Sequence, residues 1–338
     1  MSEIIEENSD KKLPRIGITM GDAAGIGAEI ILKALADNEL NKICQPIIIG
    51  DAAFLRKSVE DLNLNLEFCR AFDENSADAH KIAVFDLNNL NGEIVVGVES
   101  ALTGKSSAEY IETAVNLWRE NKIDAIATAP ISKKALHLGG YKYPGHTEFL
   151  AELTGTKEFA MSFFAEKLRV VLLSTHVSLL DAIDLVKKEK LVELIKFTNQ
   201  SLSKLLKRPV KIAVAGLNPH ASEGGMFGNQ EAEEILPAIE ECRVKHAIEV
   251  FGAYSPDTIF LRGFKGEFDA VIACYHDQAT IAVKCLSFGA SVNVTLGLPV
   301  VRTSVDHGTA FDIAGKNLAE SSSMKTAIIL AAKLVKNS

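Results

Sequence analysis

Short apolar runs alternate along the chain with longer amphipathic stretches. The apolar runs have the length of buried strands and are found at residues 15–20, 46–50, 123–128, 168–174, 211–217, 268–274, 291–296 and 299–304. The amphipathic stretches have helical spacing: one follows a glycine-rich turn at 21–27, and others cover about 52–62, 106–121, 188–207 and 230–245. Strands that alternate with helices in this way predict an α/β fold with largely parallel sheets.

Length and charge narrow the class of protein. A chain of 338 residues fits two domains, or one large α/β unit with a discontinuous second layer. The net charge of -8 argues against nucleic acid as the main partner. No apolar run is long enough to span a membrane, and the acidic opening lacks the features of a signal peptide. We therefore expect a cytoplasmic protein that does not bind a membrane.

The cysteines indicate a reducing environment. They stand at positions 44, 69, 242, 274 and 285, an odd number without any CxxC pair. This pattern suits reduced, mostly buried thiols better than a disulfide framework. Because cysteine ligands of a metal need closer spacing, we expect any metal in this protein to be held by histidine and carboxylate.

The segment from Cys274 to Ala319 is denser in polar groups than a core segment. The run 268–274 delivers His276 and Asp277 at its carboxyl end, and the run 291–296 places Asn293 among apolar neighbours. The run 299–304 carries Arg302 to its exit. Carboxyl ends of strands face the ligand crevice in open α/β sheets, so these groups predict a binding site. The alternative is that Arg302 pairs with a surface carboxylate and that Asn293 caps a turn.

Three histidines occupy equivalent places in the pattern. His176, His220 and His276 each follow a buried strand by one or a few residues. A lone histidine of this kind is seldom a ligand, but three that converge from separate strand ends would hold a divalent metal with an open coordination position. Ligation by imidazole alone favours Zn²⁺, with Mg²⁺ or Co²⁺ as alternatives.

Groups beside such a metal suggest its chemistry. Arg302 and Lys284 can neutralise a phosphate or a carboxylate. The metal would favour the alkoxide form of an alcohol and so the departure of a hydride, which requires a nicotinamide acceptor. Thr147 is a plausible N-cap with Glu148 in the first helical turn, although capping does not explain His146.

Two glycine-containing stretches invite comparison with phosphate-binding loops. The turn GDAAGIG lacks the spacing of a dinucleotide fingerprint, and it serves either an anion or helix packing. The Gly104-Lys105-Ser106 stretch is not a P-loop, because Glu99 stands where the first glycine is required.

Eight motifs resemble those of the 4-hydroxythreonine-4-phosphate dehydrogenases, the PdxA family. They are GITMGDAAGIGAE, TAPISKKAL, YPGHTEFLA, LLSTHVSL, LNPHASEGGMFGNQE, SPDTIF, YHDQ and NVTLGLPVVRTSVDHGTAFDIAGK, and together they cover the chain from Arg15 to Lys316. The resemblance implies NAD-dependent oxidation of 4-phosphooxy-L-threonine to 2-amino-3-oxo-4-phosphooxybutanoate, which loses carbon dioxide to give 3-amino-2-oxopropyl phosphate in vitamin B6 biosynthesis. It also implies a homodimer with the active site at the subunit interface, so the three histidines need not come from one chain.

The resemblance also implies a fold and a domain division. The fold is that of isocitrate and isopropylmalate dehydrogenases, with two α/β/α domains. After a flexible tail at 1–13, residues 14–135 and about 300–338 form a discontinuous first domain. Residues of about 136–299 form a second domain, which carries the metal ligands and the dimer interface.

Residue roles carry over position by position. The metal ligands correspond to His176, His220 and His276, and the substrate contacts to His146, Thr147, Lys284, Asn293 and Arg302. The general base is Lys284, Asp257 or a metal-bound water. The segment DHGTAFDIAGKNLA looks like an adenosine-binding loop, so the expected cofactor contacts are His307, Gly308, Thr309, Ala310 and Asp312.

The chain departs from the family pattern at a few positions. Ala23 and Ala28 replace prolines, which would loosen the glycine turn slightly. Ser132 stands where asparagine is usual, and Glu320-Ser321 stands where the adenosine loops have an Asn-Pro pair.

Two other functions compete with this interpretation. A paralogue that oxidises a four-carbon sugar-acid phosphate, erythronate or threonate 4-phosphate, would share the metal and phosphate sites and differ in recognition of the substrate amino group. A metal-dependent hydrolase would use the open metal position to activate water, without NAD. A phosphate acyltransferase of similar fold would have no use for three histidines at strand ends.

Overall fold

The computed structural model describes residues 12–36, 38–73, 81–287 and 290–337. Of the tail expected at 1–13, only Lys12 and Leu13 lie within these ranges, so the expectation of a flexible tail falls outside the described residues. In the described part of the chain, no helix is both long and apolar enough to cross a membrane.

Twelve strands of the described chain form one continuous sheet. In sequence order they are β1 Arg15–Thr19, β2 Gln45–Gly50, β3 Glu67–Arg70, β4 Lys81–Asp86, β5 Ala125–Thr128, β6 Ala160–Ala165, β7 Leu168–Leu172, β8 Ile212–Ala215, β9 Val250–Tyr254, β10 Ala270–Ala273, β11 Val292–Leu296 and β12 Val301–Ser304. Their order across the sheet is β3-β4-β2-β1-β5-β12-β11-β6-β7-β10-β8-β9. The predicted α/β class is confirmed, and each predicted apolar run contains a strand.

Helices connect most of these strands. The α-helices are α1 Gly27–Leu35, α2 Ala52–Asp61, α3 Ala101–Arg119, α4 Lys133–Leu138, α5 His146–Thr154, α6 Leu179–Asp184, α7 Lys188–Leu206, α8 Leu236–His246, α9 Pro256–Phe264, α10 His276–Ser287 and α11 Ser322–Asn337. Three short segments complete the set: the 3₁₀ turns η1 Leu40–Lys42 and η2 Pro219–Glu223, and the π-type turn η3 Glu231–Ile235.

Antiparallel pairing is confined to the middle of the sheet. β11 runs antiparallel to both β12 and β6, and β6 runs antiparallel to β7. All other neighbouring strands pair in parallel, which confirms the expectation of largely parallel sheets. The three antiparallel ladders therefore join two parallel groups, β3-β4-β2-β1-β5-β12 and β7-β10-β8-β9, into one sheet.

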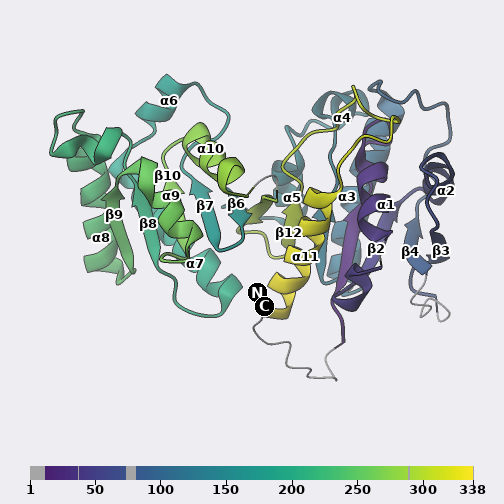
Figure 1. Cartoon of the computed structure of the whole chain (residues 1–338), viewed down its shortest axis with the longest axis horizontal. Coiled ribbons are helices and arrows are strands. Elements are labelled where there is room, and N and C mark those ends of the chain that lie inside the picture. The colour runs from purple at the N-terminus through teal and green to yellow at the C-terminus, as the bar shows by residue number, and fades with distance from the viewer. Residues whose placement is uncertain (1–11, 37, 74–80, 288–289, 338) are drawn as a thin grey trace.

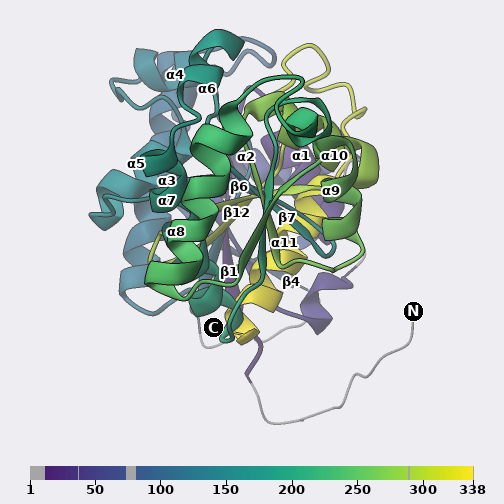
Figure 2. The same ribbon diagram turned by 90° about the vertical axis from the view of Figure 1, so that its left-hand side faces the viewer.

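The two parallel groups stand side by side, and the C-terminal helix α11 lies between them (Figure 1). One apolar core packs around β1, β2 and β5, and it includes residues from both the first half of the chain and α11. The other group has a core on each face, one under α7 and α8 and one under α9 and α10. Figure 2 shows these helix pairs on opposite sides of the strands. The domain limits expected from the sequence stay a prediction.

The glycine-rich turn between β1 and α1 is a packing device. Gly21 has φ +74°, and a Cβ there would lie 2.3 Å from the carbonyl oxygen of Pro130. A Cβ on Gly25 would lie 2.9 Å from the carbonyl oxygen of Thr309. The turn therefore needs glycine so that the backbones that follow β5 and β12 can approach it closely.

The structure corrects two local predictions. Helix α5 begins at His146 with Gly145 as its N-cap, so the prediction that Thr147 is the N-cap is wrong. Arg302 is the second residue of β12 and does not lie at the strand exit. The expectation for the cysteines is confirmed, because none of the five forms a disulfide, three are buried and Cys69 is partly buried.

Candidate active site

Three neighbouring parallel strands lead to the predicted metal ligands. β7, β10 and β8 are adjacent in the sheet, and His176, His276 and His220 follow them in that order. Because parallel neighbours end at the same edge of a sheet, the three histidines emerge from one side of this group. His276 is the first residue of α10, and His220 lies in η2.

His176 and His276 lie against each other. Their ring centroids are 5.7 Å apart, with 42° between the ring planes. Imidazole nitrogens bind zinc at about 2.0–2.1 Å, which places two rings on one ion about 5 Å apart, so small side-chain shifts suffice for these two to share a metal. Nδ1 of His276 is 2.7 Å from Oδ1 of Asp277, a contact that fixes the orientation of the ring.

His220 interacts with Asp257 of the same chain, apart from the other two histidines. It is exposed, and the charge of its imidazole contributes to lowering the pKa of Asp257, although the main cause is the hydrogen bond from Ser255 to that carboxylate. Among the described residues, no three histidine, cysteine or acidic side chains come together as a metal site. Within one chain, His176 therefore lies with His276, and His220 interacts with Asp257 in a separate group.

A buried guanidinium defines the second part of the site. Arg302 is only 2% exposed, and its Nη1 and Nη2 donate to the hydroxyls of Thr295 (3.1 Å) and Thr128 (2.7 Å). Burial lowers the pKa of Arg302 to about 9, and the charge of Glu148 opposes this shift. No carboxylate of the described chain forms an ion pair with it, so the alternative of a surface pair is wrong. A positive charge held only by neutral groups is suited to an anionic ligand.

His146 and Thr147 lie beside this guanidinium. Burial, followed by the charge of Arg302, holds the pKa of His146 well below its usual range, so its imidazole is neutral near pH 7. Its Nε2 atom has no solvent access and no hydrogen-bond partner in the structure. Thr147 Oγ1 lies 3.4 Å from Thr295 Oγ1 and thereby joins α5 to the hydroxyls around Arg302.

Asn293 and Lys284 are the other predicted substrate contacts. Asn293 lies in β11 opposite Ser304 of β12, and its Oδ1 is buried without a hydrogen-bond partner in the structure. A buried amide oxygen without a partner is costly, and a ligand donor would satisfy it. Lys284 is exposed on α10, about two turns after His276.

The predicted cofactor loop packs on the glycine turn. The amide of Ile26 donates to the carbonyl oxygen of Thr309 (3.1 Å), and Glu29 of α1 accepts a hydrogen bond from the amide of Ala319 (2.9 Å). The loop is thus anchored at both ends, while Gly308 and Asp312 stay exposed. Exposed backbone on an anchored loop fits the binding of an extended cofactor.

The structure explains the departure at Ser132. Its hydroxyl accepts from the amide of Ala135 (3.1 Å) and donates to Glu99 (2.7 Å), so it caps α4 and ties it to the segment before α3. Ser132 therefore has a structural role that a short hydroxyl side chain fulfils.

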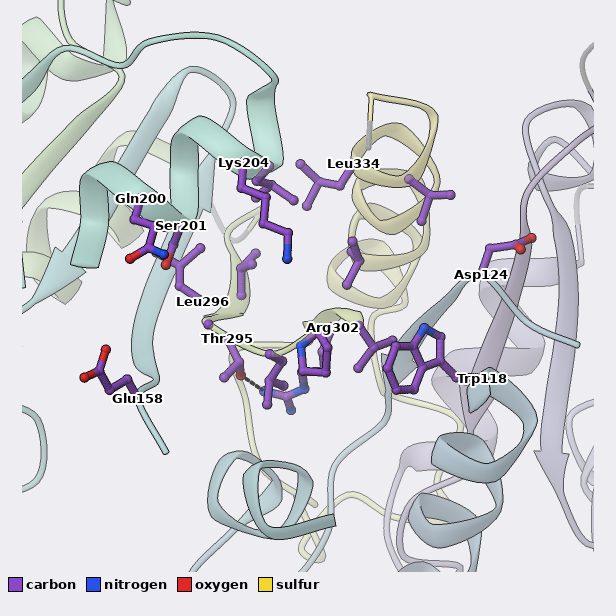
Figure 3. Close-up of a pocket in the computed structure, with 18 of the residues that line it drawn as sticks. Trp118, Asp124, Glu158, Gln200, Ser201, Lys204, Thr295, Leu296, Arg302 and Leu334 are labelled. Carbon is purple, nitrogen blue, oxygen red and sulfur yellow. Dashed lines mark hydrogen bonds between the residues drawn. The ribbon is translucent and has the colours of Figure 1, made fainter. Parts of the chain in front are cut away.

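One cavity of the described structure is lined by none of the three histidines. It measures about 710 Å³ and is lined mainly by α3, α7, α11 and the turn between β11 and β12 (Figure 3). Two of its lining residues, Arg302 and Thr295, also belong to the site described above. A second cavity of about 490 Å³ includes Asp257, Asp277 and Gln278 in its lining, and so adjoins the start of α10.

Thr128 and Thr295 were missed by the sequence analysis. Thr128 is the one hydroxyl of the apolar strand β5, Thr295 shares β11 with Asn293, and both threonines are buried. A polar residue within a buried strand is the signal that could have identified them, because a buried hydroxyl needs a partner.

We expect His146 to make the protein less stable in acid. Its pKa is lowered on folding, so between its folded pKa and about 6.5 the unfolded chain binds more protons, and stability falls as pH decreases. The unfolding free energy of His146→Gln relative to wild type should rise from about pH 7.5 to about pH 5. Denaturant titrations at each pH measure this, with the exposed His137→Gln as the control. A pH-independent difference for His146→Gln would contradict the assignment.

Comparisons with known proteins identify the family and confirm the resemblance stated above. The family described as "Pyridoxal phosphate biosynthetic protein PdxA" matches residues 42–331. A D-threonate 4-phosphate dehydrogenase of Cupriavidus necator is 46% identical, over 95% of this chain and 97% of the relative. Solved 4-hydroxythreonine-4-phosphate dehydrogenases from Burkholderia phymatum (44% identity, 96% and 99% coverage, TM-score 0.83) and Klebsiella pneumoniae (40%, 97% and 99%, TM-score 0.87) share the fold. The chain therefore belongs to the PdxA family of pyridoxal phosphate biosynthetic proteins and is an oxidoreductase of the dehydrogenase type.

Proposed function

We propose that the protein catalyses the NAD-dependent oxidation of 4-phosphooxy-L-threonine to 2-amino-3-oxo-4-phosphooxybutanoate, which decarboxylates to 3-amino-2-oxopropyl phosphate. The observation that carries this proposal is the buried guanidinium of Arg302 without an ion pair, beside a neutral His146. Such a pair suits a small substrate with a phosphate and a carboxylate. Membership of a dehydrogenase family supports the reaction type.

The second candidate substrate is D-threonate 4-phosphate. The relative from Cupriavidus necator, at 46% identity, carries that activity in its name. The two substrates share the carboxylate, the C3 hydroxyl and the 4-phosphate, and they differ at C2, where one has an ammonium and the other a hydroxyl. Groups that bind the shared parts therefore serve both, and only contacts near C2 discriminate.

Residues of this chain fit the groups that the reaction requires. We assign cofactor binding to His307, Gly308, Thr309, Ala310 and Asp312, and metal binding to His176, His220 and His276, with Zn²⁺ preferred over Mg²⁺ or Co²⁺ for imidazole ligands. When bound, NAD takes up a hydride, and a divalent ion favours the deprotonated form of an alcohol.

The side chains of the chain bind, orient and deprotonate the substrate. Arg302 forms a forked pair with the carboxylate or the phosphate, and the neutral His146 and the amide of Asn293 offer hydrogen bonds beside it. The hydroxyl proton passes to Lys284 or Asp257. The lowered pKa of Asp257 makes it a weaker base than an ordinary carboxylate. The new C3 ketone lies β to the carboxylate, so the C1–C2 bond breaks, carbon dioxide leaves, and C2 takes a proton.

We propose that a second copy of the chain completes the metal site. Large apolar side chains are exposed around each of the three histidines: Val177, Leu179 and Leu180 follow His176, Met226 and Phe227 follow His220, and Ile281 follows His276 on α10. Their exposures range from 46% to 77%. Apolar side chains gathered in this way mark an interface. A homodimer would bury them and bring His220 of one chain to the His176–His276 pair of the other.

A direct assay tests the reaction. Formation of NADH is followed with 4-phosphooxy-L-threonine and, in parallel, with D-threonate 4-phosphate and D-erythronate 4-phosphate, each with and without a chelator. We expect chelator-sensitive NADH formation with the phosphothreonine. A preference for a sugar acid would assign the protein to the second candidate. No NADH with any substrate would contradict the dehydrogenase proposal and favour a hydrolase.

Arg302 should be required for anion binding. Inorganic phosphate is expected to raise the melting temperature of the wild type, because a ligand that binds only the folded state stabilises it. Arg302→Met should lose this shift, since it removes the guanidinium that is buried between Thr295 and Thr128. The matched control is Arg208→Met, which removes an exposed arginine paired with Asp269. An undiminished phosphate shift in Arg302→Met would place the anion elsewhere.

Mixed dimers test the shared site. His220→Ala and His276→Ala should each be inactive alone, because each removes a ligand from both sites of its own dimer. After unfolding and refolding together, half of the dimers are hybrids with one intact site of two, so about a quarter of the wild-type activity should return. Each variant refolded alone is the control. Absence of recovery, with hybrids verified by differential tags, would show that the three ligands come from one chain.

A further inference from the structure

The exits of β7, β10 and β8 need restraints beyond the sheet. Ladder hydrogen bonds hold these strands together only up to about Leu172, Ala273 and Ala215, and the histidines lie three to five residues farther on. A loop that must present a side chain with an accuracy of about half an ångström depends on the groups that hold its backbone.

Gln278 joins two of these exits. Its Oε1 accepts from the amide of Cys274 (2.7 Å), and its Nε2 donates to the carbonyl oxygen of Gly216 (2.8 Å). Cys274 follows β10 and precedes His276, and Gly216 follows β8 and precedes His220. One side-chain amide thus uses its acceptor and its donor to tie the backbone before one candidate ligand to the backbone before another.

Ser174 joins the third exit to the same point. Its hydroxyl, which is 4% exposed, donates to the carbonyl oxygen of Cys274 (3.0 Å). Ser174 lies two residues before His176. The residue Cys274 is therefore held through its N–H by Gln278 and through its C=O by Ser174, so its position is set by the neighbouring strand exits on both sides.

Glu231 holds the segment that leads to His220. This carboxylate is 2% exposed, and its Oε1 accepts from the amides of Leu217 (2.8 Å) and Asn218 (2.7 Å). Its Oε2 accepts from the side-chain amide of Asn218 (2.8 Å). The next residues, 220–223, all have positive φ between 44° and 67°. Non-glycine residues in this region are strained, and they persist only where the surroundings fix them.

We propose that Ser174, Gln278 and Glu231 are positioning residues for the metal ligands. We name these three side chains the exit belt. None is a candidate ligand, and all of them bind backbone next to a candidate ligand. Gln278 is the central member, because its side-chain amide binds the backbone of both the His276 exit and the His220 exit. This inference deepens the proposed function and rests on it, because the exit belt can position metal ligands only if the histidines bind a metal.

Two substitutions at Gln278 separate its two hydrogen bonds. Gln278→Met has similar length and loses both bonds. Gln278→Glu keeps an acceptor for the amide of Cys274 but cannot donate to Gly216, and at neutral pH its charge repels that carbonyl oxygen. Ser174→Ala is a milder variant that removes one bond of the belt. Gln200→Met, at an exposed position of α7, is the matched control.

The first readout is the affinity for Zn²⁺, measured in competition with a fluorescent chelator. Loss of groups that orient metal ligands weakens affinity by about 10- to 100-fold, and we expect this range for Gln278→Met and Gln278→Glu. Ser174→Ala should show a smaller loss, and Gln200→Met none. The second readout is amide hydrogen exchange of the metal-free protein, in which Cys274 should lose protection in Gln278→Met and keep it in Gln278→Glu.

The outcomes distinguish this inference from the proposed function. If the wild type binds Zn²⁺ and the folded Gln278 variants bind it equally well, the exit belt has no positioning role and only this inference fails. If the wild type binds no Zn²⁺, Mg²⁺ or Co²⁺, the metal assignment itself fails and the inference fails with it. If Gln278→Met does not fold, the affinity of Ser174→Ala decides, and an unchanged value there overturns the proposal.

Discussion

Main-chain pairing through β11 is the constraint on which the arrangement of the candidate site depends. This strand is antiparallel to β12 on one side and to β6 on the other, and it joins two parallel groups into one sheet. Its Thr295 accepts a hydrogen bond from Arg302 of β12 and lies next to Thr147 of α5. A shift of register by one residue would turn Thr295 to the opposite face and leave the guanidinium without one of its two partners.

The electrostatics of the site follow from that packing. Arg302 is buried among neutral groups, and a buried charge of this kind is costly until an ion of opposite sign arrives. The same charge helps to keep His146 neutral, because protonation would put a second cation beside the first. In the free protein, Arg302 thus carries a buried positive charge that an anion would neutralise, and an uncharged imidazole lies next to it. This arrangement is suitable for binding an acidic substrate.

Local patterns in the sequence predicted the elements but not their contacts. Each apolar run contains a strand, and the position of each histidine after a strand could be read from the chain itself. The start of α5 was misplaced by two residues, since Thr147 looks like a cap while its hydroxyl in fact faces Thr295. The proximity of His176 to His276, and the association of His220 with Asp257, depend on strand order and loop shape. Those properties are set by tertiary packing, which residue types and spacing do not encode locally.

The difference in binding free energy between the two candidate substrates is smaller than the binding free energy of either one. The phosphate, the carboxylate and the C3 hydroxyl are common to both candidate substrates, so under the proposed assignment Arg302, His146 and the three histidines would contribute almost equally to each. At C2 the difference is one of charge. An ammonium needs an acceptor and is repelled by a guanidinium, whereas a hydroxyl tolerates either neighbour. Among the described residues, Glu148 is the carboxylate whose charge acts on Arg302, and its side chain is exposed. Discrimination for the amino acid therefore requires that its C2 group points away from Arg302 and toward a carboxylate, and this orientation is what distinguishes a phosphothreonine site from a sugar-acid site built on the same scaffold.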